Sequence, residues 1–343
     1  MLSKKRGIVK SKHTFIDSYN RSVYGKYELE SVLIDLIKSP VIQRLRNIQQ
    51  HGPDVWVWKH ANITRFEHSI GVMLLLKKFG APLQEQVAGL LHDSSHGAFS
   101  HAIDFVYGNQ LAADFADRLV TEVIGKSNMP LILKKYGFTL EEMFRMELYP
   151  LLERPAPDLC ADRIDYFFRD SHRYGVTSLD EIRTMLDSLT IANKEFVFSD
   201  PWAAFMFGSK YLEAAGRVFG SKESIFFHTM IAEAIKIALR TGILSSDDLF
   251  LLNDLEVSKV LIASQNPEIK DRLSLISPKT QLQLEEENPD VHLKVKVRLV
   301  DPKVIVGKNL KRLSEINNGY ANMLEHSRVS QGNGYKVKIR RVS

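Results

Sequence analysis

The chain has 343 residues, 44% of them hydrophobic, and a formal net charge of +5. This composition is typical of a folded protein with a substantial core and excludes general disorder. No run of about 18 uncharged apolar residues occurs, and the N-terminal segment lacks an apolar stretch of signal-peptide length, so we expect a cytoplasmic protein that neither spans nor binds a membrane.

The first three quarters of the chain favour helices. Residues 13–30 mix β-branched and aromatic residues with Asn and Gly, which predicts a short strand pair. Apolar residues then recur with helical spacing over 31–50, interrupted at Pro40, so two short helices are expected with a break between them. The same spacing continues over 65–93 and through most of 111–264.

The C-terminal region has a different pattern. Apolar and basic residues alternate strictly over 291–299, which predicts a half-buried strand, with 335–342 as a candidate partner. From Val291 onward, twelve Lys or Arg stand against three acidic residues, a balance of +9. Such a region can hold nucleic acid or polyphosphate, or can form a solvated face beside a phosphate-handling site; nucleic acid is not the favoured partner.

These patterns define the expected organisation. We predict a mainly α chain with an N-terminal strand pair and first segment at 1–30, a helical domain at 31–264 and a basic α+β region at 265–343. The acidic stretch at 284–289 is the best candidate for a linker.

Histidine and carboxylate groups are concentrated in "LLHDSSHGAFSH", residues 90–101. His92 and Asp93 are adjacent, and neighbours on a helix point about 100° apart, so they share a ligand only if the helix ends there and other groups converge. His68, on an inward helical face, and Asp162, which opens "DRIDYFFRD", can supply those groups. Each alone is more often a core histidine or a solvated carboxylate, but together the four favour a metal site.

Two imidazoles and two carboxylates from three helices form a mixed nitrogen and oxygen ligand set. This set suits one divalent ion, among Mn, Fe, Ni, Co, Zn and Mg, and the single cysteine, Cys160, excludes a cysteine-based zinc site. Open coordination positions leave room for a water, whose pKa a metal lowers to roughly 7. A phosphorus centre is the natural target, because the metal also neutralises charge on a phosphoryl oxygen.

Further polar residues fit a reaction at phosphorus. His96 and His101 follow the His-Asp pair and can donate to phosphate oxygens or protonate a leaving oxygen. Asp104, three residues after His101, can orient its ring. Arg65, one helical turn before His68, is placed for a bidentate contact to phosphate.

Four segments, "QRLRNIQQHG", "RFEHSIGV", "AGLLHDSSHGAFSH" and "DRIDYFFRDSHRYG", carry a resemblance to a known family. Over about residues 13–240 the chain resembles the HD-domain metal-dependent phosphohydrolases, and within them the deoxynucleoside triphosphate triphosphohydrolases. The resemblance implies an all-helical HD-domain core. It implies that the metal is bound by His68, His92, Asp93 and Asp162.

The resemblance also implies roles for residues around the metal. The residues that it places against the phosphates are Arg65, His96, His101 and Arg163. Gln50 and Asp170 would meet the sugar 3′-hydroxyl, and Tyr166 would pack against the deoxyribose. In these enzymes water attacks the α-phosphorus and inorganic triphosphate leaves intact, so we expect a dNTP as substrate. The family also implies a homodimer or larger oligomer, for which the apolar face of residues 31–45 offers a surface.

Three departures from the family pattern keep alternatives open. The segment "GNQLAADFADRLV" lacks an expected His-Glu pair, Phe226 stands where an aromatic hydroxyl is expected, and Arg217 is the nearest counterpart of a phosphate-binding arginine. One alternative is an HD phosphohydrolase that acts on nucleoside monophosphates or on cyclic or single-stranded oligonucleotides. Another is a catalytically silent nucleotide sensor.

Overall fold

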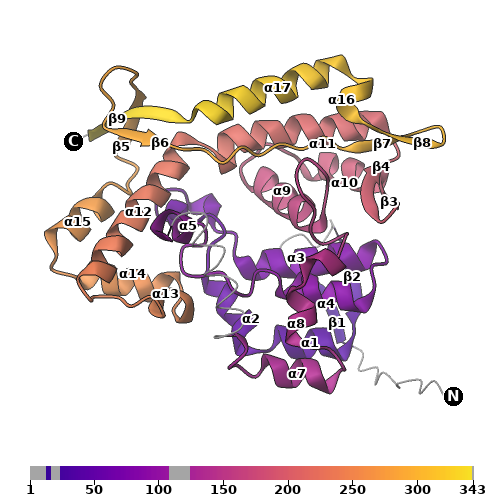
Figure 1. The fold of residues 1–343 in the computed structure, drawn as a ribbon, viewed down its shortest axis with the longest axis horizontal. Helices are drawn as coiled ribbons and strands as arrows, with labels where there is room; N and C mark the ends of the chain where they lie inside the picture. The colour runs from indigo at the N-terminus through magenta and orange to yellow at the C-terminus, as the bar shows by residue number, and fades with distance from the viewer. Residues whose placement is uncertain (1–12, 17–23, 108–123, 342–343) are drawn as a thin grey trace.

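The computed structural model describes residues 13–16, 24–107 and 124–341, and it confirms the predicted mainly α fold (Figure 1). The helices of the N-terminal half are α1 (Ser31–Ile37), α2 (Pro40–Arg44), η1 (Leu45–Asn47), η2 (Gly52–Trp56), η3 (Lys59–Ala61), α3 (Arg65–Lys78), α4 (Leu83–Leu91), α5 (Ala102–Tyr107), α7 (Met129–Lys135), α8 (Leu140–Phe144), η5 (Met146–Leu148) and α9 (Ala161–Arg173). Those that follow are α10 (Leu179–Ser188), α11 (Pro201–Ala214), η6 (Ala215–Phe219), α12 (Lys222–Arg240), α13 (Asp248–Leu251), α14 (Asp254–Ala263), α15 (Pro267–Ser274), α16 (Leu313–Ile316) and α17 (Asn318–Asn333).

The strands form three small sheets. They are β1 (His13–Ile16), β2 (Lys26–Leu29), β3 (Leu189–Ala192), β4 (Glu195–Phe198), β5 (Thr280–Leu284), β6 (Val291–Leu293), β7 (Lys303–Val306), β8 (Asn309–Arg312) and β9 (Tyr335–Arg341). The orders are β1-β2, β3-β4-β7-β8 and β5-β9-β6. The predicted N-terminal strand pair is confirmed by the antiparallel β1–β2 register.

Local sequence explains the short helices at the start. Proline lacks an N–H and fits the first helical turn, so Pro40 ends the run of α1 and begins α2, with Ser39 as its N-cap. The apolar face of α1, which we expected to be free for oligomerisation, is buried inside the chain, where Leu33 and Leu36 are fully buried. That surface prediction is therefore wrong.

The hairpin β3–β4 lies in a region predicted to be helical. Asn193 and Lys194 both have positive φ, which gives the tight two-residue turn that joins antiparallel strands. β4 then pairs in parallel with β7, in the register Phe198↔Val304. This sheet therefore crosses the expected boundary between residues 264 and 265.

The strand predicted over 291–299 is too long. β6 ends at Leu293, because its partner β9 begins at Tyr335 opposite that residue. The predicted pairing with the 335–342 segment is confirmed. The predicted linker at 284–289 joins β5 to β6, which both pair with β9 in one sheet.

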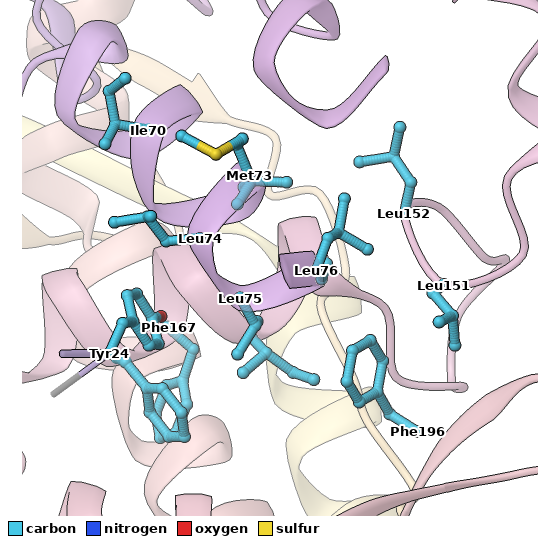
Figure 2. Packing of buried hydrophobic residues seen from close by; sticks show 14 of the residues in the cluster. Tyr24, Ile70, Met73, Leu74, Leu75, Leu76, Leu151, Leu152, Phe167 and Phe196 are labelled. Carbon is cyan, nitrogen blue, oxygen red and sulfur yellow. The ribbon is translucent and has the colours of Figure 1, made fainter. Parts of the chain in front are cut away.

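Two hydrophobic clusters hold the helices together. The larger one centres on α3, whose side chains Leu74 to Leu76 lie among Phe167 of α9, Phe196 of β4 and Leu152 (Figure 2). The second joins Ala98 and Phe99 to α12, α14 and the C-terminal sheet. The "LLHDSSHGAFSH" segment therefore passes from one cluster to the other. Within the described residues, no helix combines the length and the apolar character that a bilayer span requires.

Candidate metal centre

The start of α3 fixes His68. Thr64 and Glu67 form a capping box at this helix end, which satisfies its first N–H groups. His68 is almost fully buried, and its Nδ1 lies 2.8 Å from Oδ2 of Asp165. Its Nε2 therefore faces the other way, 2.9 Å from Oδ1 of Asp162 on α9.

His92 and Asp93 lie where α4 ends. The Nδ1 of His92 lies 2.8 Å from the carbonyl oxygen of Gly89, which fixes the ring and leaves Nε2 buried without a hydrogen-bond partner. Nε2 is 3.4 Å from Oδ1 of Asp93 and 3.5 Å from Oδ1 of Asp162. Asp93 is also 3.6 Å from Nε2 of His68.

The structure thus brings all four predicted ligands together. His68, His92 and Asp162 each offer one atom within 4.8 Å of the others. Both histidines use Nδ1 elsewhere and keep Nε2 for the centre, as metal-ligating histidines do. The donor set therefore fits a borderline divalent cation. Burial opposes the charged form of His68, but Asp162 and Asp165 raise its pKa to about 10, and a divalent cation would replace that proton.

Asp165 extends the centre outward. It accepts from His68 and, at 2.8 Å, from Nε of Arg169 one turn along α9. The four-residue spacing of Asp165 and Arg169 is that of a helical ion pair, but nothing in the sequence indicated the contact with His68. The pair packs against the backbone of Gly71, where an added Cβ would lie 2.0 Å from both side chains. Glycine is therefore required there for α3 and α9 to approach.

The predicted phosphate-facing residues border the metal ligands. Arg65 donates to Asp93 at 2.8 Å and to the hydroxyl of Ser100 at 3.0 Å. His96 Nε2 lies 3.2 Å from Asp93. Burial and the charge of Arg65 lower the pKa of His96, against the opposing effect of the Asp93 carboxylate.

His101 and Asp104 lie on the other side of His96. The rings of His96 and His101 are 5.6 Å apart, and Nδ1 of His101 lies 3.2 Å from Asp104, as the spacing predicted. Burial lowers the pKa of His101, against the opposing effect of the Asp104 carboxylate.

The turn between these histidines is strained. Phe99 and Ser100 have φ of 61° and 49°, a conformation that costs a non-glycine residue about 1–3 kcal/mol. Residues outside the turn hydrogen-bond to it. The Phe99 N–H donates to Asp254 at 2.7 Å, and the Ser100 hydroxyl donates to the backbone carbonyl of Gln49 at 2.6 Å. Asp254 also accepts from the N–H of Gln49, so it ties the two loops together.

The predicted sugar-facing residues also meet. Nε2 of Gln50 lies 3.3 Å from Oδ2 of Asp170. The other oxygen of Asp170 is 3.1 Å from His51, a buried residue that we did not predict, although it follows Gln50 directly. Tyr166 hydrogen-bonds Tyr211 through its hydroxyl.

Two predicted phosphate contacts are engaged elsewhere. Arg163 donates to the carbonyl oxygens of Arg154 and Asp158, in the loop before α9. Arg217 is exposed and pairs with Glu213 one turn earlier. Phe226 is fully buried in the second cluster. The segment "GNQLAADFADRLV" lies outside the described residues.

Comparison with known proteins agrees with this geometry. Residues 65–170 match the HD domain family. The chain is 40% identical to the uncharacterized protein YdhJ of Bacillus subtilis, over 92% of this chain and 97% of that one. It is 30% identical to the metal-dependent phosphohydrolase cns2 of Cordyceps militaris, over 82% and 83%. The chain belongs to the HD-domain family of metal-dependent phosphohydrolases.

Two further similarities are more limited. A crystal structure of a hypothetical protein from Aquifex aeolicus has the same fold, with a TM-score of 0.71, 21% identity and coverage of 93% of this chain and 99% of that one. The deoxynucleoside triphosphate triphosphohydrolase SAMHD1 of Mus musculus is 26% identical, over 52% of this chain and 35% of its own length.

Proposed function

We propose that this phosphohydrolase converts dNTPs to deoxynucleosides and inorganic triphosphate, with one divalent cation held by His68, His92, Asp93 and Asp162. One observation carries the proposal. Nη2 of Arg65 is buried beside the ligand set and has no hydrogen-bond partner, although its other nitrogens bind Asp93 and Ser100. An unpaired buried donor costs about 1–3 kcal/mol, so it marks the place of an anionic ligand.

The remaining residues of the site have separate tasks in this reaction. When bound, a divalent cation activates water and neutralises charge on a phosphoryl oxygen. Arg65 and His96 hold the phosphate oxygens. The Nε2 of His96 lies against Asp93, so its N–H would turn to a phosphate oxygen when Asp93 binds the cation. His101, oriented by Asp104, would donate a proton to the 5′ oxygen of the departing deoxynucleoside, once the negative charge of the bound phosphates has raised its lowered pKa and protonated its ring.

Recognition of the deoxyribose would use the neighbouring wall. Gln50 and Asp170 offer a donor and an acceptor for the 3′-hydroxyl, and the buried side-chain oxygen Oε1 of Gln50 lacks a hydrogen-bond partner in the described chain. Tyr166 would lie against the sugar face. The similarity to SAMHD1 supports a dNTP as the substrate. We also propose that the protein assembles from two or more copies.

A second candidate is hydrolysis of another phosphoester, such as a nucleoside monophosphate or an oligonucleotide. The relative matched over 83% of its length is named only as a metal-dependent phosphohydrolase, without a substrate, whereas murine SAMHD1 is matched over 35% of its length.

One product screen separates these functions. The manganese-loaded protein is incubated with the four dNTPs, ribonucleotides, monophosphates and short single-stranded DNA, and products are resolved by ion-exchange chromatography. We expect deoxynucleoside and intact triphosphate. Faster release of orthophosphate from monophosphates, or cleavage of DNA, would support the second candidate. Nucleotide binding without turnover would indicate a sensor. His92→Ala serves as the control that lacks a metal ligand.

A further inference from the structure

The basic residues of the C-terminal region divide into two groups. Six of the twelve Lys and Arg after Val291 form ion pairs with carboxylates: Lys303, Arg312, Arg328, Lys336, Lys338 and Arg341. Their charge is used to hold the fold. The other six form no ion pair with any described residue: Lys294, Lys296, Arg298, Lys308, Lys311 and Arg340. Among these six, Lys296 and Arg298 are the two whose charges act on His101 and Asp104 of the candidate site.

Lys296 and Arg298 belong to the segment between β6 and β7, which runs from one end of the molecule to the other (Figure 1). Although it pairs with no strand in the described chain, its backbone is fixed. The buried side chain of Gln331 accepts from the N–H of Arg298 at 2.7 Å and donates to its carbonyl oxygen at 3.2 Å. The position of Arg298 is therefore set by the fold.

This position is next to the metal-binding helix. The guanidinium carbon of Arg298 lies 5.9 Å from the centre of the Phe219 ring. That ring is 5.3 Å from the ring of Tyr166, which follows Asp162 by one turn of α9. Arg298 is thus connected to Tyr166 of α9 through the ring of Phe219.

Electrostatic effects connect the same two residues to the other side of the site. Together with burial and Arg65, the charge of Arg298 lowers the pKa of His101. Burial raises the pKa of Asp104, but the net shift is downward, and His101 and Lys296 are among the groups that lower it. Arg298 is itself the main cause that lowers the pKa of Lys296. Asp104 and Glu153 act on Lys296 through their charge but form no ion pair with it. Two cations that repel each other, with no ion pair among the described residues, favour a shared anion.

We propose that Lys296 and Arg298 form an outer phosphate subsite, which binds the β- and γ-phosphates of a nucleoside triphosphate whose α-phosphate lies at the metal centre. This inference rests on the proposed function and deepens it, because the protein would select its substrate by the length of the phosphate chain. It also supplies the triphosphate contacts that Arg163 and Arg217, engaged elsewhere, do not provide.

The test compares two double variants of the manganese-loaded full chain. K296A/R298A removes the subsite, and K308A/K311A removes two exposed charges from the β7–β8 hairpin as a matched control. Affinity for inorganic triphosphate and for orthophosphate is measured by calorimetry. Because at least two charge-assisted hydrogen bonds are lost, we expect triphosphate affinity to fall about 100-fold or more in K296A/R298A alone, with orthophosphate affinity unchanged.

The outcomes separate this inference from the proposed function. If wild-type protein fails to bind inorganic triphosphate, or if both double variants bind it like the wild type, the subsite does not exist, whatever the turnover of dNTPs. If K296A/R298A loses triphosphate affinity but no dNTP is hydrolysed by the wild type, the subsite stands and the proposed reaction falls. For an active wild type, we expect K296A/R298A to raise KM for dNTPs with little change in kcat. A circular-dichroism melt confirms that both variants are folded.

Discussion

Asp165 holds His68 from behind: its Oδ2 lies 2.8 Å from Nδ1 of that histidine, while Nε2 faces Asp162. We therefore predict that Asp165→Asn lowers metal affinity about 10- to 100-fold, as loss of such an orienting carboxylate does in other metal sites. Competition with a chelator measures the affinity. Asp187→Asn, on the exposed face of α10, is the matched control. Equal affinity in wild type and Asp165→Asn would show that this contact plays no part in metal binding.

Gly71 should be irreplaceable. In Gly71→Ala the new Cβ would lie 2.0 Å from Asp165 and Arg169, so the buried pair must separate or α3 must move away from α9. We expect unfolding in urea to become easier by about 3 kcal/mol or more.

Gly216→Ala is the control for that substitution. No atom lies within 4 Å of a Cβ at this position, and the backbone is helical, so alanine should be neutral or stabilising by up to about 1 kcal/mol. Similar losses in both variants would contradict the steric argument.

Arg65→Lys tests the geometry of the guanidinium. A lysine keeps the charge and has three N–H donors, but all three are on one atom and cannot span the positions that the planar guanidinium reaches at Asp93, Ser100 and the unpaired Nη2. We predict that kcat/KM falls about 100-fold or more, on the substrate that the product screen identifies, with metal content unchanged. Arg46→Lys, an exposed arginine on the Phe66 ring, should retain activity. Wild-type kinetics in Arg65→Lys would mean that positive charge alone suffices.

Asp254 should make stability depend on pH. Burial raises its pKa to about 7, although the N–H groups of Phe99 and Gln49 oppose the shift. Between about pH 4 and 7 the folded chain therefore keeps a proton that the unfolded chain releases, so the free energy of unfolding decreases as the pH rises through this window.

Asp254→Asn removes that titration. The variant should be less stable throughout, because an amide has one oxygen for the two N–H groups that the carboxylate accepts. Its stability should nevertheless fall less than that of the wild type between pH 5 and 7.5, in urea titrations monitored by tryptophan fluorescence. Parallel pH profiles would show that Asp254 ionises normally.

Much of the candidate site was predictable because its signals are local. Helical spacing identified the segments of α3, α4 and α9. His68 and Asp162 lie within α3 and α9, and His92 and Asp93 directly follow α4, at positions that the motifs mark. The contacts that orient the donors were harder to predict. The approach of Asp165 to His68 depends on how two helices pack, and on a glycine whose role appears only when both are in place.

The C-terminal region shows why pattern alone misassigns strands. Alternation over 291–299 is real, but a strand also needs a partner, and β9 reaches only as far as Leu293. Beyond it, the side chain of Gln331 satisfies the backbone of Arg298. The hairpin β3–β4 was missed for the converse reason, since its four-residue strands are too short for a periodic signal.

The parallel pairing of Phe198 with Val304 also has a consequence for synthesis of the protein. While the chain leaves the ribosome, β4 emerges long before β7. The backbone groups on the β4 edge of the β3–β4 hairpin therefore stay unpaired until β7 has been synthesised. An unprotected edge of this kind invites association with other nascent chains. The last third of the protein therefore completes a sheet that begins with β3 and β4. A chain released before β7 is made would expose the unpaired edge of β4 and would be prone to aggregate.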